Sequence, residues 1–204
     1  TTETDLGPLG SGQPSRLFAS DTDGTVDLHF KWLSQYGLDG MNLQRFISEV
    51  HSPRHFEMRN TVSRLVKEKA AKYQKYFYLT YDISGASEDS FVNDITNDWV
   101  NTIEGDLQLP QSPWYARHAG KPVVLLWGFG FSDRPGTVQQ AIDLTNWFRA
   151  RGVYVVGGVP YEWRTGANSK PGFAAAYANF DMVQPWGVGA VVTDADIQSH
   201  YENI

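Results

Sequence analysis

The sequence contains no cysteine, so disulfide bonds and cysteine-ligated metal sites are excluded. It is also short of positive charge, because 17 lysine and arginine residues face 23 aspartate and glutamate residues and the net charge is −6. A nucleic-acid-binding protein would show a basic face. We therefore expect no nucleic acid among the partners of this protein.

Several functional signals are also missing. No apolar run approaches the length of a membrane-spanning helix, and the first residues do not resemble a signal peptide, so we expect no membrane association. Gly128-Phe129-Gly130 lacks the third glycine of a dinucleotide-binding turn, and no P-loop occurs. The five histidines are scattered, and Pro53 interrupts the one pair with helical spacing, His51 and His55. The sequence predicts neither a cofactor nor a metal site.

The sequence does show a repeated pattern of an apolar strand followed by an amphipathic helix. In the central example, residues 76–82, aromatic and β-branched residues lead to Asp82, and Ser84-Gly85 follows. A long amphipathic pattern precedes this strand and another follows it. The predicted strands are residues 38–46, 76–82, 121–127, 153–159 and 180–186, and the predicted helices are residues 25–36, 54–75, 87–107, 136–152, 172–179 and 194–202.

This alternation, without hairpin signals, predicts a parallel sheet. Five such units fit either an open doubly wound sheet or most of an eight-stranded barrel. The first would suggest a nucleotide-binding metabolic enzyme, and the missing phosphate loop counts against it. We therefore predict an α/β fold of the (β/α)8 TIM-barrel type, with about five βα units visible in this chain.

The predicted domain organisation is a single domain over residues 1–204, with residues 1–20 as a surface loop. Five strands would leave two open sheet edges, which can pair with another chain. We expect either that the barrel continues in further polypeptide or that a partner covers these edges, and self-association through them is one possibility.

Several blocks of the sequence resemble one group of carbohydrate-active proteins. The blocks are VDLHFKWL (26–33), YGLDG (36–40), LQRF (43–46), YDISG (81–85), HAGKPVV (118–124), WGFGF (127–131), GGVP (157–160) and WR (163–164). They look like the glycoside hydrolase family 71/99-like proteins, a group often described as xylosidases or arabinosidases. The resemblance covers about residues 16–190.

This resemblance implies a (β/α)8 barrel that acts on carbohydrate and is usually secreted. It also implies one more strand before Thr1 and two after Ile204. In the family 99 enzymes, the paired catalytic acids lie on the loop of a late strand. The characterised activities of families 71 and 99 are endo-acting on α-linked glucan or mannan.

Acidic residues at strand ends are the candidate catalytic groups. Asp82 and Glu162 follow two predicted strands, and glycosidases use a pair of carboxylates that flank the scissile bond. Their separation would be about 5–5.5 Å in a retaining enzyme and about 6.5–9.5 Å in an inverting enzyme. Asp82 could instead cap the turn at Ser84 or form an ion pair with Arg45, and Glu162 could be a solvated loop acid.

Aromatic, amide and guanidinium groups near the same strand ends are the candidate substrate-binding groups, because rings stack on sugar C–H groups and Gln and Arg donate to hydroxyls. The predicted set is Gln44, Arg45, Trp127, Tyr161, Trp163, Arg164, Gln184 and Trp186. The rings could instead fill the upper layer of the barrel. We predict a glycoside hydrolase that acts on an oligosaccharide or polysaccharide and, from the resemblance, is secreted or extracellular. The alternative is a carbohydrate-binding protein on the same scaffold that has no turnover.

Overall fold

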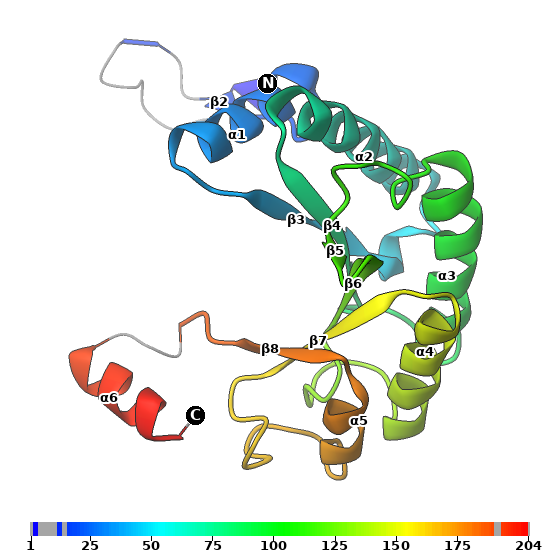
Figure 1. The fold of residues 1–204 in the computed structure, drawn as a ribbon, viewed down its shortest axis with the longest axis vertical. Helices are drawn as coiled ribbons and strands as arrows, with labels where there is room; N and C mark the ends of the chain where they lie inside the picture. The colour runs from blue at the N-terminus through cyan, green and yellow to red at the C-terminus, as the bar shows by residue number, and fades with distance from the viewer. Residues whose placement is uncertain (1, 4–11, 14–15, 190–192, 204) are drawn as a thin grey trace.

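The computed structural model describes residues 2–3, 12–13, 16–189 and 193–203. Its main sheet contains parallel strands in the order β3 (Gly40–Phe46), β4 (Tyr76–Asp82), β6 (Lys121–Trp127), β7 (Tyr154–Pro160) and β8 (Met182–Trp186). The order in space follows the order along the chain, as in the wall of a barrel. The sheet is curved and does not close, because β3 and β8 are its free edges in the described part of the chain (Figure 1).

Helices precede and follow these strands, and all of them except the last cover the convex side of the sheet (Figure 1). They are α1 (Asp23–Gln35) before β3, the 3₁₀ helix η1 (Ile47–Glu49) and α2 (Pro53–Tyr73) after β3, α3 (Phe91–Asn97) and the π-helix η2 (Asp98–Asp106) after β4, α4 (Val138–Ala150) after β6, α5 (Ala174–Asn179) after β7 and α6 (Asp194–Asn203) after β8. The predicted parallel sheet with alternating helices is therefore confirmed.

Three of the five strands differ in their bounds from the prediction, since β3 begins at Gly40, β8 begins at Met182 and β7 is shifted by one residue to Tyr154–Pro160. The shifts at β3 and β8 have a common cause. The backbone N–H of Leu38 donates to the carbonyl of Leu33 at the end of α1. The N–H of Phe180 likewise donates to an α5 carbonyl, so both residues complete a helix end instead of joining the sheet.

Short antiparallel strands add to the predicted elements. Part of the predicted loop 1–20 is paired, since β1 (Thr2–Glu3) lies antiparallel to β2 (Arg16–Leu17). Residues 1, 4–11 and 14–15 of that predicted loop lie outside the described residues. β5 (Arg117–His118) pairs antiparallel with the start of β6, at the end of the sheet away from the strand carboxyl termini.

The hydrophobic core lies between the convex side of the sheet and the helices. Phe91, Ile95, Trp99 and Ile103 recur every four residues along α3 and η2, and all four are fully buried. Trp99 meets Phe148 of α4 edge-on, with ring centroids 5.1 Å apart. Burial of a Phe or Ile side chain contributes roughly 1.5–3 kcal/mol. This core holds the helices on one face and leaves the concave face for other side chains.

Candidate functional site

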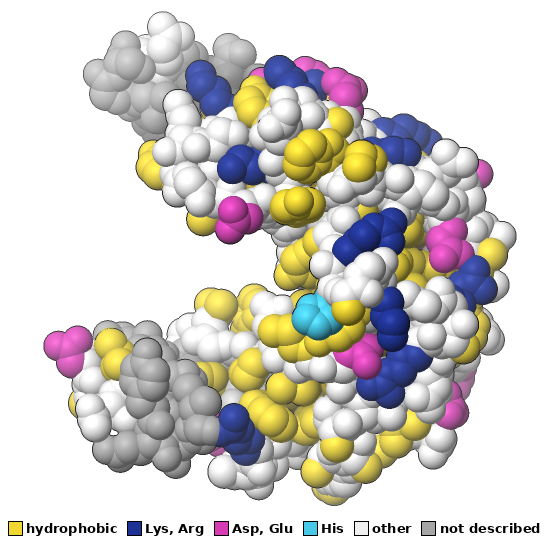
Figure 2. All heavy atoms as spheres, viewed as in Figure 1, with side chains coloured by type: hydrophobic (Ala, Val, Ile, Leu, Met, Phe, Trp, Pro, Cys, Tyr) yellow, Lys and Arg dark blue, Asp and Glu magenta, His cyan; other side chains and the backbone are white. Residues whose placement is uncertain are grey.

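The concave face of the sheet carries a pocket of about 420 Å³ near the carboxyl ends of the strands. Alternate residues of a strand point to the same face, so the pocket is lined by every second residue. The lining residues are Asn42, Gln44, Phe46, Thr80, Asp82, Ser84, Leu125, Trp127, Arg134, Gln184 and Trp186. Figure 2 shows the hollowed side of the molecule, between the part that carries β3 and the part that carries β8. Barrel folds hold their active sites at this end of the strands.

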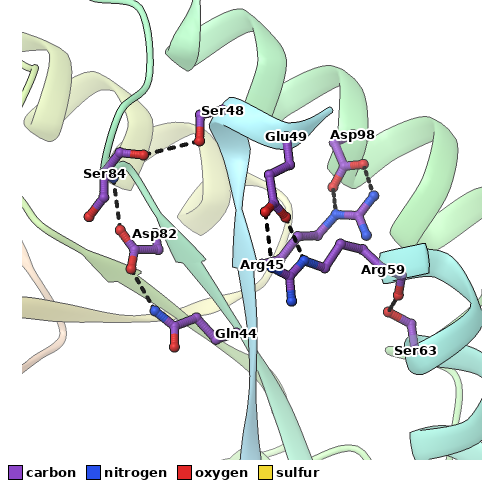
Figure 3. A network of polar contacts seen from close by, with 9 residues as sticks. All are labelled: Gln44, Arg45, Ser48, Glu49, Arg59, Ser63, Asp82, Ser84 and Asp98. Carbon is purple, nitrogen blue, oxygen red and sulfur yellow. Dashed lines mark hydrogen bonds and ion pairs between the residues drawn. The ribbon is translucent and has the colours of Figure 1, made fainter. Parts of the chain in front are cut away.

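Asp82 is the last residue of β4 and is 2% exposed. Gln44 Nε2 donates a hydrogen bond to Asp82 Oδ2 at 2.5 Å, and the backbone N–H of Ser84 donates to Oδ1 at 2.8 Å (Figure 3). Asp82 therefore closes the turn after its strand, as the alternative interpretation anticipated. Both donors are neutral, and no cation in the described part of the chain pairs with this carboxylate. The result is a negative group with a fixed orientation at the edge of the pocket.

Arg45 lies outside this pocket, and the expected ion pair between Arg45 and Asp82 is not formed. Arg45 is 1% exposed and points away from Gln44, to the convex side of β3 (Figure 3). Its Nε and Nη2 donate to Asp98 at 2.8 and 2.7 Å, and the Tyr81 hydroxyl donates to Asp98 at 2.7 Å. Burial raises the pKa of Tyr81 well above its usual value, and the charge of Asp98 adds to this shift. Gln44 and Arg45 cannot share the pocket because consecutive strand residues face opposite sides.

Trp127 and Trp186 form an aromatic wall of the pocket, with ring centroids 5.3 Å apart and planes at 74°. Trp127 is half-buried, with Phe131 at 5.0 Å and the Arg134 guanidinium at 5.4 Å from its ring. A Cβ at Gly158 would lie 2.4 Å from Trp127 Cδ1, so only glycine at this position of β7 leaves room for the ring. Trp186 is 44% exposed, and its free ring surface can meet the C–H face of a sugar.

The loop after β7 carries the remaining predicted residues, Tyr161, Glu162, Trp163 and Arg164, none of which belongs to the described pocket lining. Glu162 is exposed and accepts a hydrogen bond from Asn168 Nδ2 at 3.3 Å. Arg164 lies over the ring of Trp163, 5.3 Å from its centroid. The structure thus brings five predicted residues together, which are Gln44, Asp82, Trp127, Gln184 and Trp186.

Sequence reasoning missed six lining residues, which are Asn42, Phe46, Thr80, Ser84, Leu125 and Arg134. Five of them could have been found from the two-residue period of a strand. Asn42 and Phe46 stand two residues from Gln44, Thr80 and Ser84 stand two from Asp82, and Leu125 stands two before Trp127. Arg134 lies in the irregular loop after β6, where no period applies.

The pocket lining keeps hydrogen-bonding capacity that the described part of the protein does not use. Thr80 Oγ1, Trp127 Nε1 and Arg134 Nε are buried and have no hydrogen-bond partner there. His, Asp and Glu side chains do not gather in groups of three suited to a metal ion within the described ranges. Among the same residues, no helix combines the length and apolarity that a membrane crossing requires.

The curved parallel sheet with helices on its convex side defines an α/β fold of the TIM-barrel type, with the barrel not closed. A solved structure described as a glycoside hydrolase-like protein shares this fold, with a TM-score of 0.50 and 14% sequence identity. The match covers 78% of this chain and 48% of that chain, so this chain spans about half the length of that protein.

A second similar structure is the GH99 endo-alpha-mannosidase from Bacteroides thetaiotaomicron. Its TM-score is 0.38 and its identity 10%, over 82% of this chain and 68% of that chain. No protein-family model and no curated protein matches the sequence. The expected likeness to family 71 and to xylosidases stays a prediction.

Proposed function

We propose that this protein is a carbohydrate-active protein of the glycoside hydrolase type, whose pocket holds part of an oligosaccharide or polysaccharide. One observation carries the proposal: a buried, oriented carboxylate, Asp82, faces the same pocket as the exposed ring of Trp186. A ring surface for sugar C–H groups beside a fixed carboxylate supplies two parts of a glycosidase site, a stacking surface and one of the two carboxyl groups. The fold shared with a glycoside hydrolase-like protein supports this proposal.

In this proposal, Asp82 acts as the nucleophile or as the base that activates water. The hydrogen bonds from Gln44 and from the Ser84 backbone fix the orientation of both carboxyl oxygens, as either role requires. Gln44 and Gln184 supply amide groups for sugar hydroxyls from opposite sides of the pocket, on β3 and β8. Glu162 is our candidate for the second acid, because it follows β7 at the same end of the sheet.

The second candidate function is sugar binding without hydrolysis. The observation that favours it is the composition of the pocket, in which Asp82 is the one acidic residue among the described lining residues. Glycosidases of either stereochemistry need two carboxyl groups around the scissile bond. A pocket with a single carboxylate can bind a sugar and leave its glycosidic bond intact. In both cases we propose that the sugar is extracellular and that the protein meets it outside the cell.

A panel of polysaccharides tests both functions in one experiment. Each polymer, including an α-mannan, an α-glucan, a xylan and an arabinan, is incubated with the protein, and new reducing ends and bound protein are measured in parallel. Hydrolysis of one polymer supports the first function. Binding without reducing ends after several days supports the second. Neither binding nor hydrolysis across the panel contradicts both.

A further inference from the structure

Two charged side chains line the pocket in the described part of the chain, Asp82 and Arg134. Asp82 is bonded to Gln44 and to the backbone of Ser84, and no hydrogen bond or ion pair joins it to Arg134. Arg134 forms its ion pair with the adjacent Asp133, whose side chain is 69% exposed. The Arg134 side chain is 23% exposed, so the pair is open to water mainly on the Asp133 side, and that water weakens it. The positive charge of Arg134 is therefore available to another anion.

The position of Arg134 is fixed by the ring of Trp127 and by backbone contacts of its loop. The guanidinium lies over the ring of Trp127, 5.4 Å from the centroid. Its backbone carbonyl accepts a hydrogen bond from Lys170 Nζ at 2.5 Å, and the nearby N–H of Gly136 donates to the Glu88 carboxylate at 3.1 Å. These contacts hold the loop after β6 between its two neighbouring loops. The contacts of Lys170 and Glu88 do not involve the side-chain nitrogens of Arg134, and its buried Nε has no hydrogen-bond partner among the described residues.

We infer that Arg134 makes the pocket selective for a sugar that carries a carboxylate, such as a uronic acid unit. A planar guanidinium matches a carboxylate with two parallel, charge-assisted hydrogen bonds, which a neutral hydroxymethyl group cannot form. Arg134 contacts Trp127, and Trp127 contacts Trp186. A sugar ring that stacks on Trp186 can therefore direct its own carboxylate toward Arg134. Asp82, from the neighbouring strand, then faces the uncharged part of the sugar. This inference rests on the proposed carbohydrate function and narrows its substrate class.

Matched pairs of methyl glycosides test the selectivity. Methyl glucuronide is compared with methyl glucoside, and methyl galacturonide with methyl galactoside, so each pair differs only at C6. Dissociation constants are measured by NMR titration of the wild-type protein and of Arg134→Gln. We expect at least one uronide to bind the wild type about tenfold more tightly than its neutral partner, or ~1.4 kcal/mol. Arg134→Gln should remove this preference, because it weakens uronide binding far more than binding of the neutral glycoside, and raised salt should reduce the preference in the wild type.

Asp133→Asn is the matched control, because it removes the exposed partner of Arg134 and keeps the guanidinium. It should retain the preference for the uronide or increase it. If Arg134→Gln does not fold, Arg134→Lys and the salt dependence of the wild type replace it, and Lys should keep only part of the preference.

Three outcomes would contradict the inference. Equal affinity within every pair for the wild type would mean that Arg134 does not select an anion. A preference that survives in Arg134→Gln would assign the selectivity to another group. Loss of both the acidic and the neutral ligand in Arg134→Gln would give the residue a structural role. If the wild type binds none of the four glycosides and no polysaccharide of the panel, the proposed function itself is wrong and this inference falls with it.

Discussion

At the scale of single residues, two buried carboxylates of the same region have different partners. Asp98 is bonded to Arg45 and Tyr81 on the convex side of the sheet, and its negative charge is compensated. Asp82 receives only neutral donors and borders the pocket. A buried charge without a counter-charge costs stability, so its presence calls for a functional explanation. This contrast supports the proposed functional role of Asp82, and it gives Asp98 a structural role.

The first prediction concerns Asp82→Asn. If the protein is a hydrolase, kcat/KM should fall by about 10²–10⁴-fold, the usual contribution of a positioned acid or base. The fold should be kept, because Asn can still accept the hydrogen bond from the Ser84 N–H. Hydrolysis of the best polysaccharide is measured beside the melting temperature. Asp143→Asn on the exposed face of α4 is the control, and equal activity of both variants would remove Asp82 from the mechanism.

The second prediction concerns Asp98→Asn. The substitution leaves the buried guanidinium of Arg45 without its counter-charge, so the free energy of unfolding should fall by about 3–5 kcal/mol. Glu57→Gln is the control, because the pair between Glu57 and Arg64 is exposed on α2 and should contribute less than about 1 kcal/mol. Urea denaturation measures both. A similar small loss in the two variants would show that the buried pair is not a structural centre.

At the scale of elements, the sequence predicts the presence of the strands well. It predicts the orientation of their side chains less well. All five main strands were predicted because apolar runs end in polar groups and amphipathic helices separate them. Gln44 and Arg45 both belong to the predicted substrate-binding set, although adjacent strand residues face opposite sides. Arg134 was missed because a loop has no period, and its place over Trp127 depends on contacts that are distant in sequence. The local sequence pattern therefore predicts the sheet, but it predicts only part of the pocket lining.

The helix after β4 shows a second limit of local pattern. The sequence predicts one helix over residues 87–107, and its four-residue spacing of apolar residues is confirmed by their burial. The structure begins this helix at Phe91 and changes it to a π-helix from Asp98, so that the N–H of Leu107 donates to the carbonyl of Thr102. Apolar residues spaced four apart lie on nearly the same face in an α-helix and in a π-helix. Sequence periodicity therefore cannot report this shift in hydrogen bonding, which accompanies the Arg45 contact to Asp98.

A third prediction concerns the contact between two loops. Lys170 Nζ donates to the carbonyls of Arg134 and Gly136, at 2.5 and 3.1 Å. Lys170→Met keeps the apolar stem and removes both bonds, at a cost of about 1–2 kcal/mol of local stability. Amide hydrogen exchange in residues 131–134 should accelerate by roughly tenfold, and sugar affinity should fall.

Lys121→Met is the matched control, because Lys121 is exposed at the other end of β6. It should leave exchange in residues 131–134 unchanged. Unchanged exchange in Lys170→Met as well would mean that the loop is held by other contacts, such as the Phe131 bridge to Ser169.

At the scale of the whole molecule, the described sheet is open between β3 and β8. Free strand edges carry unpaired backbone groups, and Met182 on β8 is 54% exposed. We propose that the protein self-associates through these edges. Sedimentation velocity should show species larger than the 22.9 kDa monomer as concentration rises, and Met182→Lys should reduce them. Val100→Lys on η2 is the control, and equal effects of the two variants would place the contact elsewhere.

Binding of a sugar in the pocket between β3 and β8 is the proposal on which the function of this protein depends. The indole N–H signals of the seven tryptophans test it most directly, once Trp→Phe variants have assigned them. During titration with the best oligosaccharide of the panel, the signals of Trp127 and Trp186 should shift with one dissociation constant, and those of Trp32 and Trp99 should stay in place. Shifts confined to Trp32, which is as exposed as Trp186 but lies on α1, would contradict the claim and move the binding surface away from Asp82.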